Sequence, residues 1–155
     1  EFVSRYGGNI RAYLGHNDPL DINVDESDFT KLFNIMNGNL VLWKNEIVKY
    51  IEDLVLKNGP IVAKAFPGRA AIIIKYLDLN ETHFSAIYEI KGSIKVGYYA
   101  PGTRIPILPE SELYANNKQS DPIINLAWHI PKEVQDNLLS NGYTGEMINI
   151  KEMKP

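Results

Sequence analysis

Beyond Pro60, short apolar runs alternate with helix-like segments, and this alternation limits the possible folds more than any other feature of the sequence. The runs that read as strands are Ile61–Phe66, Phe84–Tyr88, Arg104–Leu108, Pro122–Trp128 and Glu146–Ile150. The helix-like segments between them are Gly68–Leu77, Glu110–Ala115 and Pro131–Ser140. Continuous apolar strands separated by helices are typical of a parallel sheet that is covered on both faces. The sequence therefore predicts a small Rossmann-like α/β fold, with a mostly parallel sheet and helices on both faces.

The part of the chain before Pro60 reads as one strand and one long helix. Asn9–His16 alternates apolar and polar residues, which is typical of a strand. From about Ser27 to Lys57, apolar residues recur every three or four positions, which places one apolar stripe along a helix roughly 45 Å long. Asn37-Gly38-Asn39 leaves open whether this is one helix or two, and the stripe packs either on its own sheet or on something outside the domain. We predict that residues 1–58 form this N-terminal strand and helix and that residues 59–155 form the α/β core, the two together making one domain.

The composition argues against several classes of function. The 155 residues include 16 Lys and Arg against 19 Asp and Glu, and a net charge of −3 argues against a nucleic-acid partner. The chain has no cysteine, which excludes a disulfide scaffold, a thiolate zinc site and a cysteine nucleophile. Apolar runs such as Ala70–Ile74 are far shorter than the roughly 20 residues of a membrane-spanning helix, and the chain opens without a signal peptide. We therefore expect a cytoplasmic protein without a membrane partner, and the start at Glu1 instead of Met indicates a fragment of a longer chain.

Ligands of open α/β sheets gather beyond the carboxyl ends of the strands, and the first candidate there is the turn before the helix that begins near Gly68. A helix N-terminus can hold a phosphate, and Arg69 would add a bidentate contact. The dinucleotide fingerprint is absent, because Ala63 and Ala65 stand where its glycines would be. The alternative is that Arg69 is an ordinary surface residue.

The second and third candidates are the loop Lys91–Arg104 and His129. The loop combines glycines, cations and tyrosines without a helical pattern, which suits a phosphate or a sugar nucleotide, although a plain hairpin with a turn at Pro101-Gly102 would look the same. His129 ends an apolar run and could donate to a ligand or act as a base, or have only a structural role. The histidines have no metal-ligand spacing, and we predict no catalytic residue and no metal site in this chain.

Several motifs, taken in order, carry a family resemblance. The first motif is Gly7-Gly8-Asn9-Ile10-Arg11-Ala12-Tyr13, and a long helix follows it. The later ones are Ile73-Ile74-Lys75-Tyr76, the stretch from Lys95 to Ile107 with Pro101-Gly102-Thr103 inside it, and Ala127-Trp128-His129 followed by Glu133. On these motifs, residues 6–150 resemble the C-terminal domain of bacterial S-adenosylmethionine-dependent sugar-nucleotide C-methyltransferases, which build branched deoxysugars.

The sequence departs from the family pattern at the edge that faces the ligand. The family's glycine-rich turn, roughly Gly-Tyr-Gly-Ala, is here Ala63-Lys64-Ala65-Phe66. The acidic residue at the end of the second strand is missing from its usual place unless Glu89 substitutes for it, and His129 replaces an Asn. These departures indicate a diverged member or one with an altered substrate.

The resemblance implies a division of labour in a longer protein. In the family, a zinc module and the domain that binds the cofactor and holds the acid/base residues both precede this region. S-adenosylmethionine and a structural zinc are then expected upstream, and no cofactor is expected on this chain, which alone would not be catalytic. Its partners would be a nucleotide-linked keto-deoxysugar, the upstream domain of the same polypeptide and a possible second copy. The implied substrate contacts are Arg11, Tyr13, Arg69, Lys95, Gly97, Gly102, Thr103 and His129.

Two other functions stay open from the sequence. The chain could be a stand-alone nucleotide- or sugar-binding module that regulates or assembles with a partner. It could also be a structural interaction domain, in which the missing glycines mark a lost ligand and the long helix serves as the interface.

Overall fold

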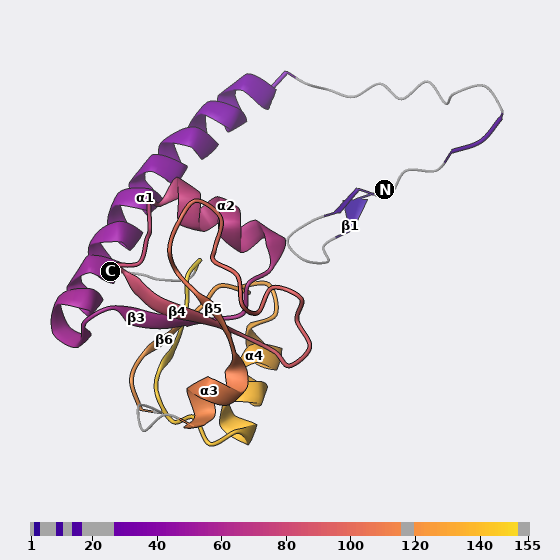
Figure 1. Cartoon of the computed structure of the whole chain (residues 1–155). Coiled ribbons are helices and arrows are strands. Elements are labelled where there is room, and N and C mark those ends of the chain that lie inside the picture. Colours follow the sequence, from indigo (N-terminus) through magenta and orange to yellow (C-terminus); the bar gives the residue numbers. More distant parts are fainter. Residues whose placement is uncertain (1, 4–8, 11–13, 17–26, 116–119, 152–155) are drawn as a thin grey trace. The chain divides into compact units, whose positions relative to one another are not determined.

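A computed structural model describes residues 2–3, 9–10, 14–16, 27–115 and 120–151 (Figure 1). The chain forms two compact units, residues 1–43 and residues 44–155. In the first unit, β1 (Phe2–Val3) pairs antiparallel with β2 (Asn9–Ile10). The strand predicted for residues 9–16 is thus only partly observed: residues 14–16 lie in no strand, and residues 11–13 are outside the described part.

The long helix α1 (Phe29–Asn58) begins in the first unit and ends in the second. It continues through Asn37-Gly38-Asn39, so the alternative of two helices is wrong. In its second half, Ile47 and Ile51 are buried, which accounts for the apolar stripe there. Lys44 donates to the carboxylate of Asp78 at 2.7 Å and so ties this half to the end of the next helix.

The second unit contains a five-stranded, all-parallel sheet. Its elements are β3 (Ile61–Lys64), α2 (Gly68–Tyr76), β4 (Phe84–Glu89), β5 (Ile107–Pro109), α3 (Glu110–Ala115), β6 (Ile123–Asn125), α4 (Pro131–Ser140) and β7 (Met147–Asn149). The strand order is β5-β4-β3-β6-β7, with every neighbouring pair parallel. This confirms the predicted α/β fold with its parallel sheet, in which the first strand lies at the centre.

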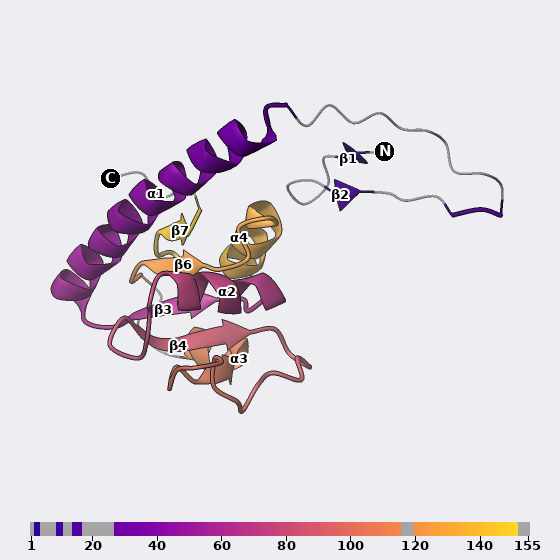
Figure 2. The same ribbon diagram turned by 90° about the horizontal axis from the view of Figure 1, so that it is seen from above.

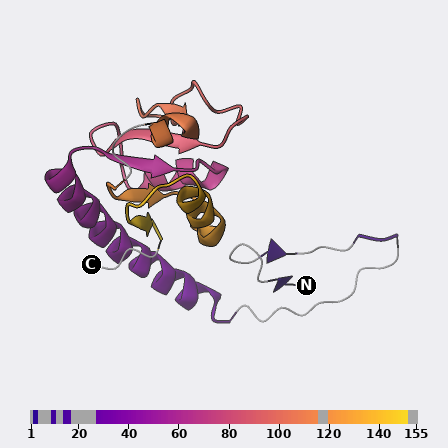
Figure 3. The same cartoon turned by 90° about the horizontal axis from the view of Figure 1, so that it is seen from below.

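Helices cover both faces of this sheet, as predicted. Figure 2 shows α2 over one face, on the same side as the second half of α1, and Figure 3 looks onto the face that α3 and α4 cover. One apolar cluster fills the space between these two helices and the sheet. In it, Leu113 of α3 and the α4 residues Val134 and Leu138 pack with apolar side chains of β4 and β6. Burial on both faces explains why the strands read as continuous apolar runs.

All five strands of the sheet differ in their bounds from the prediction, and β3 ends at Lys64 instead of Phe66. The apolar run Pro122–Trp128 forms a strand only as far as Asn125, whose side-chain oxygen accepts the backbone N–H of Ala127 at 2.8 Å and turns the chain. β5 begins at Ile107 instead of Arg104, because the preceding residues form a hairpin that includes an antiparallel bridge between Tyr99 and Pro106. Within the described residues, no helix is long and apolar enough to span a membrane.

Candidate functional site

A cavity of about 290 Å³ lies at the carboxyl ends of β3, β4 and β6, and we call it the carboxyl-end cavity. β3 lies at the centre of the sheet: the next strands in the chain, β4 and β5, lie on one side of it, and β6 and β7 lie on the other. The strand order therefore reverses next to β3, at this cavity. Crevices at such points are the usual ligand sites of open parallel sheets. The residues that line it are Lys64, Ala65, Phe66, Pro67, Glu89, Ile90, Lys95, Ala127, His129, Ile130, Glu133, Val134 and Asn137.

The turn after β3 shapes the floor of this cavity. Ala65 has a φ of 64°, in the left-handed region that normally favours glycine, and its N–H donates to the carbonyl of Tyr88 at 2.9 Å. The conformation costs Ala roughly 1 kcal/mol relative to glycine. The next N–H, that of Phe66, donates to the Glu89 carboxylate at 2.8 Å. The chain therefore makes a glycine-type turn without the glycine.

Glu89 is the last residue of β4, so an acidic residue does end the second strand of the sheet, as the sequence allowed. The residue is only 7% exposed, and its carboxylate also accepts the N–H of Ile90 at 3.2 Å. Lys95 lies 3.4 Å from the same carboxylate and donates to the carbonyl oxygen of Phe66. Glu89 and Lys95 together hold the turn in place.

A second ion pair, between Lys64 and Glu110, is more deeply buried. Lys64 ends β3 with 2% of its surface exposed, and its ammonium lies 2.6 Å from the carboxylate of Glu110, the first residue of α3. Lys64 lines the carboxyl-end cavity, whereas Glu110 lines a separate hollow of about 560 Å³ next to Lys91 and Tyr114. Burial and the Glu110 charge raise the pKa of Tyr114 well above its usual value, so it stays a neutral phenol.

His129 enters the cavity from the turn between β6 and α4. Burial lowers the pKa of His129, the positive charge of Arg69 lowers it further, and Glu133 in the first turn of α4 acts in the opposite direction. The imidazole is therefore neutral at pH 7, with one nitrogen able to donate and the other able to accept. The cavity thus combines two ammonium groups, an imidazole, two carboxylates and the amide of Asn137 with an apolar remainder of the lining.

The family model of the C-methyltransferase C-terminal domain matches residues 5–148. The chain belongs to this family. No curated protein in the comparison matches the chain. Membership confirms the resemblance to the C-terminal domain of C-methyltransferases, and the carboxyl-end cavity lies in this domain.

The C-methyltransferase C-terminal domain brings only some of the residues predicted for substrate binding together. Lys95 and His129 line the carboxyl-end cavity. Arg69 lies at the start of α2, and its positive charge lowers the pKa of His129. Sequence reasoning did not name Lys64, Phe66, Glu133 or Asn137 as site residues; the signal for Lys64 and Glu133 was their place at the end of a strand and the start of a helix.

The other predicted residues lie elsewhere. Gly97 donates to the carbonyl of Ile107 at 2.9 Å, and the N–H of Thr103 closes a turn onto Ala100 at 3.0 Å. Gly102, inside this turn, has a φ of 76°. These three residues build the hairpin before β5, the alternative that the sequence left open. Arg11 and Tyr13 are outside the described residues.

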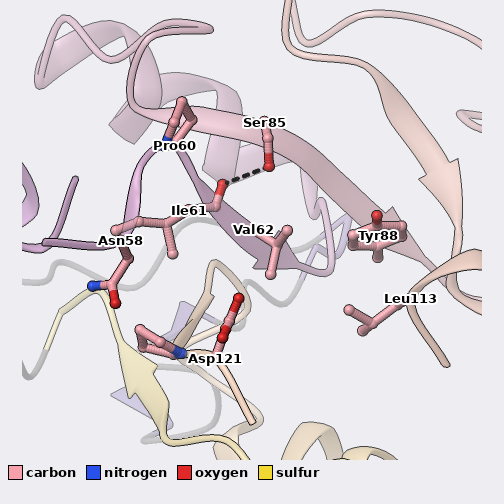
Figure 4. A pocket seen from close by; sticks show the side chains of 9 residues that line it. Asn58, Pro60, Ile61, Val62, Ser85, Tyr88, Leu113 and Asp121 are labelled. Atoms are coloured by element: carbon pink, nitrogen blue, oxygen red, sulfur yellow. Dashed lines mark hydrogen bonds between the residues drawn. The ribbon is translucent and has the colours of Figure 1, made fainter. Parts of the chain in front are cut away.

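A smaller cavity of about 150 Å³ lies at the opposite end of the sheet, and we call it the amino-end cavity (Figure 4). Ser85 and Asp121 supply polar groups to it, and the Ser85 hydroxyl donates to the carbonyl of Ile61 at 3.2 Å. Its size excludes a sugar nucleotide. Among the described residues of this C-methyltransferase C-terminal domain, no group of three or more His, Cys, Asp or Glu side chains could hold a metal ion.

Proposed function

We propose that this domain forms the substrate side of a methyl-transfer site and that its carboxyl-end cavity holds the diphosphate and sugar of a nucleotide-linked keto-deoxysugar. The observation that carries the proposal is the convergence of Lys95, His129 and Glu133 on one cavity at the reversal point of the sheet. An ammonium attracts a diphosphate, while an imidazole and a carboxylate provide hydrogen-bond partners for sugar hydroxyl and keto groups.

The size of the cavity supports a shared site. Pockets that enclose a whole ligand of drug size measure roughly 300–1,000 Å³, and a sugar nucleotide is larger than most such ligands. At about 290 Å³, the carboxyl-end cavity has room for only part of it. The rest would face the part of the enzyme that precedes this domain.

Lys95 can serve both the turn and a ligand. Its ammonium has three donors, of which the Glu89 carboxylate and the Phe66 carbonyl take two. The side chain is 40% exposed, so the third donor can reach a phosphate oxygen in the cavity. The ion pair with Glu89 would then hold the ammonium at one place before the ligand binds, which reduces the entropy lost on binding.

The chain's own residues do not fit a cofactor of the dinucleotide or S-adenosylmethionine type. The turn after β3, where such a group would approach the backbone, carries Ala65, and its next N–H is already taken by Glu89. S-adenosylmethionine would supply the methyl group from the preceding part of the protein. This domain would bind the sugar nucleotide, orient it and exclude water from one side.

The test is an NMR titration of the ¹⁵N-labelled chain with a nucleoside diphosphate-linked keto-deoxysugar. We expect saturable shift changes at the amides of Lys95, His129 and Glu133, with a dissociation constant in the millimolar range or below. Lys95→Ala should weaken binding about tenfold, because one charge-assisted hydrogen bond is lost. Lys95→Arg should retain most of the affinity.

Lys132→Ala is the matched control, because Lys132 is an exposed lysine on α4 that pairs with Asp136 and does not line the cavity. It should bind as the wild type does. The proposal fails if millimolar ligand shifts none of the cavity amides, or if the changes occur only around Ser85 and Asp121 at the amino-end cavity.

A further inference from the structure

The first half of α1 is apolar on more than one side. Residues 29–43 contain a single charged side chain, Lys31. Phe33, Met36 and Leu40 continue the stripe that is buried at Ile47 and Ile51 in the second half. On the opposite side of the helix, Ile35 is 51% exposed and Leu42 is 62% exposed. A helix that is apolar on opposite sides needs more than one partner surface.

The side that carries Ile35 and Leu42 has a regular pattern, and we call it the outer face. Its residues are all exposed and recur at intervals of three or four, which places them on one side of the helix. The mean spacing is that of a coiled-coil seam, about 3.5 residues. In chain order, the outer face consists of Asp28, which directly precedes α1, and of Lys31, Ile35, Gly38, Leu42, Glu46 and Lys49 within it.

The residues of the outer face complement those of a second, identical outer face that runs in the opposite direction. Read from one end it runs acidic, basic, apolar, glycine, apolar, acidic, basic. Against a second copy in the opposite direction, Lys31 faces Glu46 and Ile35 faces Leu42. By the same register Asp28 faces Lys49, and Gly38 lies at the centre. Both charge pairs are attractive in this one arrangement, and both occur twice in a symmetric pair of helices.

We propose that the outer face of α1 binds the outer face of a second copy of this chain, with the two helices antiparallel and crossing at Gly38. A Cβ at Gly38 would meet nothing within 4 Å of its own chain, so glycine is not needed there for the fold of one copy. Without a side chain at the crossing point, two helices can approach closely. A parallel pair would instead place Lys31 against Lys31 and Glu46 against Glu46.

The charge pairs cannot form within one copy. Lys31 and Glu46 are separated along the same helix by roughly 22 Å, well beyond the reach of a salt bridge. A coupling between them in solution therefore reports contact between two chains. This property makes the arrangement directly testable with charge reversals.

The test measures self-association of the full 155-residue chain by sedimentation velocity, from low micromolar to high micromolar concentration. The wild type should form a dimer. Lys31→Glu and Glu46→Lys, each alone, place like charges opposite each other twice per dimer, and each should raise the dimer dissociation constant at least about tenfold. An equimolar mixture of the two variants should restore wild-type affinity, because both contacts become attractive again in the mixed dimer.

Two further variants separate this contact from general effects. Glu52→Lys changes an exposed residue of α1 outside the outer face by the same charge and should leave the dimer intact. Leu42→Asp should abolish the dimer, while circular dichroism shows an unchanged helix content. The proposal is overturned if the wild type stays monomeric over the whole range, or if mixing the two charge variants gives no gain over either alone.

Discussion

The two ends of the parallel sheet differ in the type of residue that they carry. At the amino ends, where a cavity of about 150 Å³ lies, β3, β4 and β6 begin with Ile61, Phe84 and Ile123, all buried and apolar. At the carboxyl ends, Lys64 and Glu89 are the last strand residues, both charged and both buried, beside a cavity of about 290 Å³. One end is packed for stability, and the other holds groups that are costly to bury.

The carboxyl ends of the strands carry features that lower the stability of the domain. Burying a charge disfavours folding unless a partner compensates, and a left-handed Ala65 adds backbone strain at the same place. At the amino end, the hydroxyl of Tyr143 donates to the carbonyl of Asp121, and burial raises the pKa of Tyr143 to about 12, so that this donor keeps its proton. Substitutions at the two ends should therefore change the free energy of unfolding by amounts that differ in sign and size.

The largest effect is expected from the buried ion pair. Lys64→Met removes one partner and leaves the Glu110 carboxylate partly buried, which should lower the free energy of unfolding by about 3 kcal/mol. Lys64→Met combined with Glu110→Gln should recover more than half of this loss. Urea denaturation measures both. Lys132→Met, which breaks an exposed pair on α4, should cause no measurable change. A fully stable Lys64→Met variant would remove the contrast between the two ends.

The next largest effect is expected at the amino end, where Gly145 packs tightly. A Cβ at this position would lie 2.0 Å from the carbonyl oxygen of Asp121, so the backbone must move. Gly145→Ala should lower the free energy of unfolding by about 2 kcal/mol. Gly68→Ala is the control at the carboxyl end, because its Cβ would meet nothing within 4 Å at the start of α2. Thermal denaturation should show a loss for Gly145→Ala and no loss for Gly68→Ala.

A smaller effect of opposite sign is expected at the turn after β3. Ala65→Gly restores a residue that tolerates a φ of 64° and should stabilise the domain by about 0.5–1 kcal/mol. Ala63→Gly, two residues earlier in the extended and buried strand, should destabilise it instead. If both variants lose stability in urea, the turn is not strained.

The smallest effect is expected from His129 on acidification. Burial and Arg69 lower the pKa of His129 in the folded domain below its ordinary value of 6.5. Below about pH 6.5 the unfolded chain then binds a proton at His129 more readily than the folded domain does. The free energy of unfolding therefore decreases as the pH falls from about 6.5 to the lowered pKa of the folded state. Above about pH 6.5, His129 does not make stability depend on pH. His129→Asn should reduce this slope. Urea midpoints at pH 7.5, 6.5 and 5.5 measure it, and equal slopes would contradict it.

The sequence predicted the architecture because burial on both faces leaves a direct trace in apolar runs. It did not predict where β6 ends, because Leu126 and Ala127 are buried in a turn as completely as they would be in a strand. The amide of Asn125 decides that boundary, and its hydrogen bond to Ala127 has no counterpart in hydropathy.

The site was predicted in part for a similar reason. Lys95 and His129 were named because polar residues after apolar strands mark the ligand edge of a parallel sheet. The glycines of the loop serve a hairpin, and a glycine-rich sequence reads the same for a turn and for a phosphate loop. The pairing of Lys64 with Glu110 joins residues far apart in the chain, and no local pattern indicates it.

The central position of β3 has a consequence for how the domain is made. β3 is the first strand of the sheet to leave the ribosome, and its neighbour β6 is not synthesised until about 60 residues later. At roughly 5–20 residues per second, one edge of the apolar strand waits roughly 3–12 s for its partner. During this interval β3, β4 and β5 can pair, but the edge that will receive β6 stays open to other chains. The wall of the carboxyl-end cavity that α4 provides is also the last part of it to be synthesised.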